Sequence, residues 1–235
     1  MRFRECRAVR WITLAAAGWL TFGAWAADHP LETVFGRMDQ AAAKFKGLTA
    51  DMTRVAHEGA IGEEDTETGT ITVRLPKPHD LRMLLNFKTP DVKAVEVAGS
   101  KVLVFYPKSL TAQQIDVGRA HKALMEQFLK LGFGSTSREM QEAFKVEYGA
   151  AEKVSDQDTT RLTLTPKSAD MAAQFPKMEL WISDASGIAM QQKFYQPGKT
   201  YNLITYTNMR LNPPISDSDV KIKLPPGVKI EPLKR

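Results

Sequence analysis

The chain has 235 residues, a formal net charge of +5 and a single cysteine. Cys6 lies in an N-terminal segment that we expect to be removed, so the remaining chain has no thiol for a disulfide, a nucleophile or a metal ligand. The same removal takes away four arginines and one glutamate and leaves a net charge of about +2. The chain has no stripe of Lys and Arg of the kind that a phosphate backbone requires, which excludes nucleic acid as a partner.

The first 26 residues have the pattern of a cleaved secretory signal. A basic flank precedes an apolar run from Trp11 to about Ala24, and Ala24-Trp25-Ala26 supplies the small residues that a signal peptidase reads. The apolar run is shorter than the roughly 18 residues of a membrane span. Cys6 precedes this run, whereas the acylated cysteine of a bacterial lipoprotein follows it. We therefore expect cleavage before Ala27, export to the periplasm and a single domain over residues 27–235.

One amphipathic helix is predicted from about Pro30 to Lys46. Asp28 can cap its start, Pro30 suits its first turn and Gly47 ends it. Its apolar residues recur at three- and four-residue steps: Leu31, Val34, Phe35, Met38, Ala42 and Phe45. A single apolar stripe means a single buried side, so this helix must pack on another element.

Period-2 alternation of apolar and polar residues predicts strands through most of the remaining chain. The predicted strands are Gly69–Leu75, Leu81–Lys88, Val92–Ala98, Lys101–Tyr106, Gln113–Val117, Lys145–Glu152, Arg161–Thr165, Met178–Ser183, Ile188–Tyr195, Tyr201–Arg210 and Val220–Leu224. Short turns join most of them, which favours antiparallel pairing of neighbours. A sheet of about eleven strands does not stay flat, so we expect it to curl towards a barrel.

Two helices interrupt the strands in the middle of the chain. Arg119 to Leu131 has an apolar arc wider than a helix needs to lie on a sheet, and it is either a packed core helix or a lid. Gly132-Phe133-Gly134 ends it. A second, short helix is predicted from Ser137, as its cap, to Phe144.

The sequence offers no catalytic or metal-binding constellation. His29, His57, His79 and His121 lie far apart, and none has a metal-ligand spacing. The segment that begins at Gly132 lacks the Gly-Lys-Thr ending of a phosphate loop. These observations predict a protein that is not an enzyme, with no catalytic residue, no metal and no cofactor.

Two acidic stretches are interpreted as solvated surface. Glu63–Glu67 lacks the ligand spacing of a calcium loop and is predicted to be a hairpin tip. The pair Asp217 and Asp219 is interpreted in the same way.

Five short motifs follow one another along the chain. They are Gly69-Thr-Ile-Thr-Val-Arg-Leu-Pro, Leu81-Arg-Met-Leu-Leu-Asn-Phe with Thr89-Pro90, Gly99-Ser-Lys-Val-Leu-Val-Phe-Tyr-Pro107, Leu162-Thr-Leu-Thr-Pro166 and Lys223-Leu-Pro-Pro-Gly-Val-Lys229. Their order and spacing resemble the LolA family of periplasmic lipoprotein carriers over nearly the whole chain after the signal. The first motif is similar to the family's G-x-L-x-V-x-x-P strand, and the third to its dGktlwvYdP segment.

This resemblance implies a mainly β (α+β) fold: an incomplete antiparallel barrel of about eleven strands, with an N-terminal helix and central lid helices over an apolar concave side. It also implies a carrier that takes acylated lipoprotein or another lipid from an inner-membrane transporter to an outer-membrane acceptor; we expect a monomer. Family members usually have an Arg directly before the Pro that ends the first long strand, where it latches the lid closed. Here that place is Leu75, flanked by Arg74 and Lys77.

Acyl chains require little more than a dry, adaptable wall, because each buried methylene contributes about 0.8 kcal/mol and Leu, Met and Phe repack easily. The candidate lid residues are Leu124, Met125, Phe128, Leu129, Leu131 and Phe133. The candidate residues of the sheet wall are Val73, Leu81, Met83, Leu85, Phe87, Leu180, Ile182, Ile188 and Met190. Three alternatives remain open: a periplasmic sensor or interaction module on the same half-barrel, a carrier of a different lipid such as a hopanoid, glycolipid or phospholipid, and, last, a hydrolase whose catalytic residues come from distant parts of the chain.

Overall fold

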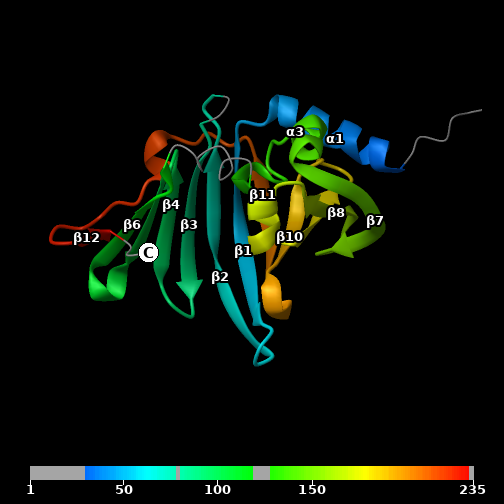
Figure 1. Cartoon of the computed structure of the whole chain (residues 1–235). Helices are drawn as coiled ribbons and strands as arrows, with labels where there is room; N and C mark the ends of the chain where they lie inside the picture. Colours follow the sequence, from blue (N-terminus) through cyan, green and yellow to red (C-terminus); the bar gives the residue numbers. More distant parts are fainter. Residues whose placement is uncertain (1–29, 78–79, 119–127, 233–235) are drawn as a thin grey trace, which may run out of the picture.

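The computed structural model describes residues 30–77, 80–118 and 128–232, and its centre is one 12-stranded sheet (Figure 1). The strand order is β12-β6-β5-β4-β3-β2-β1-β11-β10-β9-β8-β7. The strands are β1 Gly47–Glu58, β2 Glu63–Arg74, β3 Arg82–Thr89, β4 Lys93–Ala98, β5 Lys101–Tyr106, β6 Thr111–Asp116, β7 Phe144–Val154, β8 Gln157–Pro166, β9 Lys177–Ser183, β10 Ala189–Tyr195, β11 Tyr201–Leu211 and β12 Lys229–Pro232. Neighbours pair antiparallel except β12, which runs parallel to β6. The expected incomplete antiparallel barrel is confirmed.

The two faces of the sheet follow from strand alternation. Met83 of β3 pairs with Val73 of β2 and Val97 of β4, and all three side chains are buried on one face. Because successive residues of a strand point to opposite sides, Leu84 and Glu96 belong to the other face. We call the side that carries Met83 the inner face and the opposite side the outer face.

The N-terminal helix α1 spans Pro30–Lys44 and buries Val34, Phe35 and Met38, which confirms the central part of its predicted apolar stripe. It ends two residues before the predicted Lys46, so Phe45 of that stripe follows the helix. Helix α1 lies beside the short helix α3, Ser137–Ala143 (Figure 1). Asp39 fixes the two helices together, because its carboxylate accepts hydrogen bonds from the backbone N–H and the hydroxyl of Ser137 at 2.6 and 2.7 Å.

The N-cap of the predicted short helix lies one residue earlier than expected. The N-cap is Thr136, not Ser137, because Thr136 and Glu139 form a reciprocal capping box. A further short helix, α4 at Ala169–Gln174, was not predicted; the Ser168 side chain caps it.

One strand was not predicted, and two predictions along the strands are wrong. The chain from Gly47 to Glu58 is a full strand, β1, which the local pattern did not predict. Glu63–Glu67 is not a hairpin tip but the start of β2, where it pairs with β1. Val220–Leu224 is not a strand, since the 3-10 helix η3 at Asp217–Val220 ends there and the chain forms β12 only at Lys229.

Residues 212–228 form a C-terminal strap that crosses the sheet and leads to the edge strand β12. Asn212 begins it by completing the end of α1: its side-chain oxygen accepts from the N–H of Lys46 and Gly47, and its amide donates to the carbonyl of Lys44. Further along, Glu96 accepts a 2.7 Å hydrogen bond from the N–H of Ile222. Because Glu96 is on the outer face, the strap covers that side of the sheet.

Candidate functional site

Two apolar clusters occupy different halves of the inner face. The first cluster is covered by helices: Val34 and Met38 of α1, Met140 of α3 and Met171 of α4 pack on buried residues of β7–β10. The second cluster lies on β1–β4 and includes Leu48, Ala50, Met52, Ile71, Val73, Leu81, Met83, Phe87, Val97 and Tyr206. None of the described helices contributes a buried residue to this second cluster.

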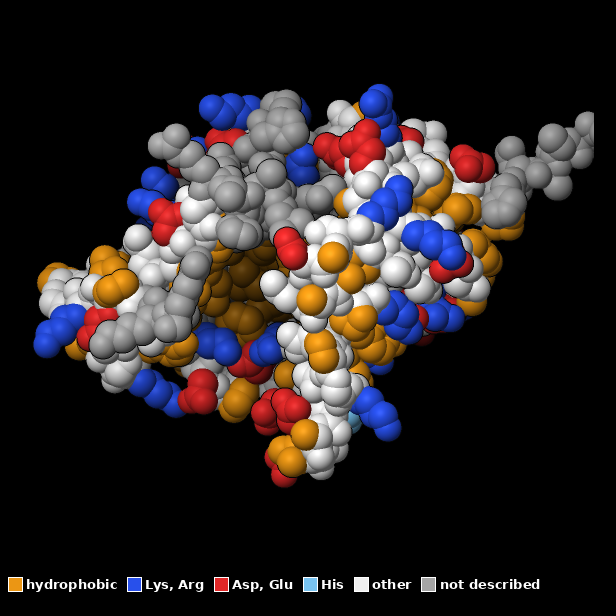
Figure 2. All heavy atoms as spheres, viewed as in Figure 1, with side chains coloured by type: hydrophobic (Ala, Val, Ile, Leu, Met, Phe, Trp, Pro, Cys, Tyr) orange, Lys and Arg blue, Asp and Glu red, His pale blue; other side chains and the backbone are white. Residues whose placement is uncertain are grey.

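A hollow opens at the second cluster, where the described helices bury no residue. Figure 2 shows this hollow with hydrophobic side chains on its floor and charged groups at its lower edge. Leu85, Val95 and Val102 pack against the second cluster and stay half-buried. Apolar side chains in that position can contact a ligand without any change in the fold.

Residues 131–135 form the bridge between the two clusters. Leu131 is buried in the first cluster and Phe133 in the second, each 1% exposed. Gly132 lies between them with φ +77°, and a Cβ there would lie 2.4 Å from the Cβ of Ala189. Only glycine fits that combination of positive φ and close approach.

A buried polar network holds the same bridge to the sheet. Gln192 donates to the carbonyl of Leu131 at 2.5 Å, and the Tyr206 hydroxyl donates to the Gln192 side-chain oxygen at 2.9 Å. The N–H of Ala189 donates to the carbonyl of Gly132 at 3.0 Å. Gln192 is 4% exposed, so both halves of its amide are satisfied inside the protein.

The structure separates the predicted lid residues into three groups. Leu124 and Met125 lie outside the described residues. Leu131 and Phe133 are fully buried anchors of the bridge. The remaining two lie partly buried at the border: Phe128 stacks with Phe175 and packs on Phe194, with ring centroids 5.1 and 4.9 Å apart, and Leu129 packs against the second cluster.

The predicted wall residues divide in the same way. Val73, Leu81, Met83, Leu85, Phe87 and Ile188 belong to the second cluster or pack against it. Leu180 and Ile182 share the inner face but lie in the first cluster, under the helices. Met190 is placed differently: it packs with Trp181 and Val154 on the outer face. Met190 is therefore not part of the inner wall of the hollow.

A cluster of charges, which the sequence did not predict, continues the inner face of β1, β2 and β4. Arg54 donates to one carboxylate oxygen of Glu67 and Lys93 to the other, both at 2.5 Å. Arg54 also donates to the side-chain oxygen of Asn202. Burial alone would raise the pKa of Glu67, but the hydrogen bonds and charges of Lys93 and Arg54 outweigh it and lower that pKa. We call Arg54, Glu67, Lys93 and Asn202 the polar cluster.

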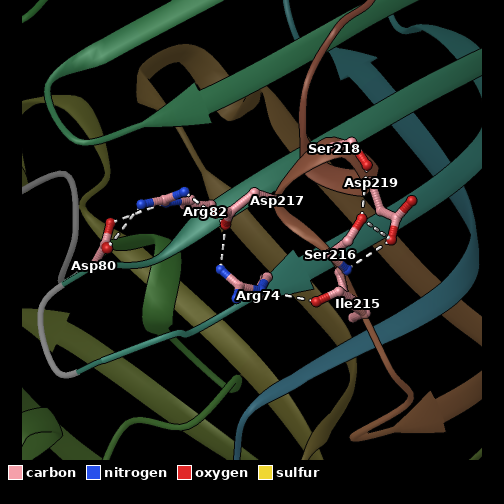
Figure 3. Close-up of polar contacts among 8 residues, drawn as sticks. All are labelled: Arg74, Asp80, Arg82, Ile215, Ser216, Asp217, Ser218 and Asp219. Atoms are coloured by element: carbon pink, nitrogen blue, oxygen red, sulfur yellow. Dashed lines mark hydrogen bonds and ion pairs between the residues drawn. The ribbon is translucent and has the colours of Figure 1, made fainter.

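At the strand end where the LolA resemblance places a latch, the structure has contacts with the strap on the outer face. Leu75 packs partly against the second cluster, whereas Arg74 faces the strap (Figure 3). Arg74 donates to the carbonyl of Ile215 at 2.9 Å and to Asp217 at 2.5 Å. Asp217 also accepts from Arg82 at 2.8 Å, so it is a bridging group and not a free surface charge.

Arg74→Ala should loosen the strap and leave the hollow unchanged. The substitution removes one hydrogen bond to Ile215 and one to Asp217, which keeps Arg82 as a donor. The Arg74–Asp217 ion pair is partly exposed and contributes at most about 1 kcal/mol to global stability. We therefore expect faster amide hydrogen exchange at residues 215–222 and unaltered binding of an apolar probe. Unchanged exchange, or lost probe binding, would contradict this assignment of Arg74.

A separate groove of about 500 Å³ lies between the strap and the outer face. Leu84, Ala94 and Phe105 line it from the sheet, and Ile222 lines it from the strap. It opens on the side of the sheet opposite to the hollow, because Leu84 alternates with Met83 of the inner face. Phe87 and Lys93, which also belong to the inner rows, line one end of it.

Within the described ranges, no group of three or more His, Cys, Asp or Glu side chains is arranged to hold a metal ion. No helix in those ranges is long and apolar enough to span a membrane.

The chain matches no protein-family model and no curated protein sequence. Solved structures do match. An uncharacterized conserved protein from Thermus thermophilus has a TM-score of 0.52 at 12% identity, over 87% of this chain and 99% of that one. MucB has a TM-score of 0.50 at 11% identity over 82% of this chain, which spans only 62% of the MucB chain. A LolA superfamily protein from Nitrosomonas europaea has a TM-score of 0.40 at 12% identity, over 81% of this chain and 97% of that one.

The chain shares its fold with MucB and with the Thermus thermophilus protein. At these identities the matches show the fold alone, which leaves the function to be argued from the hollow. The order of helix, half-barrel and strap supports the resemblance seen in the five sequence motifs.

Proposed function

We propose that this protein is a periplasmic carrier that binds the acyl chains of a lipoprotein, or of a related lipid, in the hollow and moves them towards the outer membrane. The observation that carries the proposal is the second cluster, on which the described helices bury no residue and whose half-buried Leu85, Val95 and Val102 form an apolar floor. Burial of acyl methylenes on such a floor contributes about 0.8 kcal/mol each. The resemblance of the five sequence motifs to the LolA family supports the same proposal.

The remaining parts of the proposal follow from the resemblance to LolA-type carriers. The cargo is acylated lipoprotein or lipid, the donor is an inner-membrane transporter and the acceptor is an outer-membrane protein. The first 26 residues act as the export signal. The working protein is a monomer that needs no metal or cofactor and has no enzymatic activity.

Calorimetry with an apolar acyl probe tests the binding step. Because the proposed site buries apolar surface, we expect a negative heat-capacity change on binding and the same affinity with and without a chelator. Loss of binding on chelation, or a heat-capacity change near zero, would overturn the proposal.

A second candidate is a periplasmic interaction module on the same half-barrel. It is favoured by MucB, one of the two structures above with a TM-score of at least 0.5, which has been solved in complex with MucA from Pseudomonas aeruginosa. Native mass spectrometry of the purified protein separates the candidates. Co-purified triacylated protein supports the lipoprotein carrier, free lipid supports a carrier of another lipid, and a lipid-free protein complex supports the interaction module.

A further inference from the structure

We propose that the cargo has an anionic head group, which Arg54 and Lys93 bind at the end of the hollow while its acyl chain lies on the apolar floor. This inference rests on the proposed function and narrows its substrate class to an acyl amphiphile that ends in a carboxylate or a phosphate.

The position of the polar cluster makes it the end wall of the apolar floor. Arg54 continues the inner row of β1 after Ala50 and Met52, and Lys93 precedes Val95 on the inner face of β4. Glu67 pairs directly with Arg54 across β1 and β2. Figure 2 shows basic and acidic side chains together at the lower edge of the hollow. A chain lying along the floor would therefore reach these charges at one end.

The polar cluster carries one positive charge in excess. Two cations share the single carboxylate of Glu67, whose two oxygens each accept one short hydrogen bond. The other described partner of Arg54 is the neutral side chain of Asn202, and Lys93 lies 4.6 Å from the centre of the Phe87 ring. These ion pairs thus bring the group to a net charge of +1.

No second described carboxylate pairs with the two cations. Asp91 lies two residues from Lys93, but it is largely exposed and pairs with Lys108 at 2.9 Å. Asp65 shares the inner row of Glu67 and is exposed, with no ion pair to Arg54 among the described contacts. The excess charge is therefore available to a ligand.

Burial gives that excess charge its energetic weight. The side chains of Arg54 and Lys93 are 31% and 24% exposed, so part of their hydration is already lost before any ligand binds. A partly desolvated cation gains more from an anion than one in open water does, and hydrogen bonds between charged groups are the stronger class. The apolar floor would then bind the acyl chain of the ligand, and the polar cluster would bind its anionic head group.

Competition between a charged and a neutral amphiphile tests the inference. A neutral apolar dye is bound to the full protein and displaced at neutral pH by dodecanoate or by methyl dodecanoate, which share one acyl chain. We expect dodecanoate to displace the dye at a concentration about tenfold lower, as one charge-assisted contact implies. Equal displacement by both amphiphiles would overturn the inference and leave the proposed function intact. Displacement by neither would mean that the proposed function itself fails.

Two substitutions move the preference in opposite directions. Lys93→Met leaves Arg54 and Glu67 as a neutral pair, so the preference for dodecanoate should vanish while methyl dodecanoate binds as before. Glu67→Gln removes the competing carboxylate, so the preference should increase. Lys101→Met is the matched control, because Lys101 is exposed on the outer side of β5 and its loss should leave the preference unchanged. A thermal melt of each variant establishes that it is folded, and retention of the native preference in folded Lys93→Met would overturn the inference.

Dodecyl phosphate distinguishes the two sources of negative charge. It is compared with dodecanoate in the same displacement assay. Stronger displacement by the phosphate in the native protein, lost in Lys93→Met, would identify a phospholipid-like head group. Stronger displacement by the carboxylate would identify a fatty acid, and each result supports an anionic ligand at this cluster.

Discussion

Val102→Glu should lower the affinity for an acyl probe by about a hundredfold or more while the protein melts within a few degrees of the native one. Val102 lies on the inner face of β5, opposite Val97, and is only half-buried against the second cluster. In the free protein the new carboxylate can stay hydrated in the open hollow. An acyl chain on the floor would bury it unpaired, which costs several kcal/mol, whereas a hundredfold loss of affinity corresponds to about 2.8 kcal/mol.

Two control variants show whether the loss of binding comes from the charge, from the size of the side chain or from its position. Val102→Ile keeps an apolar side chain at the same position, so probe binding should be retained. Thr72→Glu puts the same charge on the outer face of β2, opposite Leu84, and should also bind normally. Normal binding by Val102→Glu would exclude this face as the site. Equal loss in both glutamate variants would point to a general effect of charge.

The fold was predictable where local periodicity is strong. The 3.6-residue stripe of α1 and the period-2 rows of β3, β5 and β9 lie within a residue or so of their expected places. β1 was missed although Leu48, Ala50 and Met52 alternate with polar residues, because Arg54 interrupts the apolar row. That arginine is tolerated on the inner face only because Glu67 lies opposite it, which no local pattern reveals.

In the strap, apolar and polar residues alternate although the chain forms no strand. Val220, Ile222 and Leu224 alternate as a strand would, but Val220 is buried within the strap at 1% exposure and the N–H of Ile222 donates to the Glu96 side chain. The alternation therefore reflects contact with the outer face and not pairing in a ladder. The hydrogen-bond partner of Ile222 is Glu96, which lies 126 residues away, and no local sequence pattern reveals this contact.

The site was predictable in part for the same reason. The odd-numbered row from Leu81 to Phe87 lies on the inner face, because all of its residues are apolar, whereas the even-numbered row has Leu84 between Arg82 and Asn86. Met190 was misplaced because a register shift between Ala189 and Gln191 reverses the parity that Ile188 sets. The polar cluster was not predicted because its charges come from three different strands and become neighbours only through pairing of those strands.

Phe133→Ala should lower the free energy of unfolding by about 3–5 kcal/mol, the range for deletion of a buried phenyl ring. Phe133 is 1% exposed, and its ring meets Tyr206 edge to face at 5.1 Å between centroids. For a domain of this size we expect the midpoint of thermal unfolding to fall by about 10 °C. Chemical denaturation of the native and variant proteins gives the free energy, and scanning calorimetry gives the midpoint.

The size of that loss decides what residues 131–135 do. If Phe133 were part of a lid that contacts cargo, its removal would weaken probe binding and leave the melting temperature nearly unchanged. As an anchor of the bridge, it should do the reverse, because Leu131 and the Gln192 hydrogen bonds hold the same segment from the other cluster. Phe133→Leu keeps most of the buried volume and should cost less than half as much as Phe133→Ala. A loss below about 1 kcal/mol for Phe133→Ala would mean that the bridge is not anchored there and would return Phe133 to the lid.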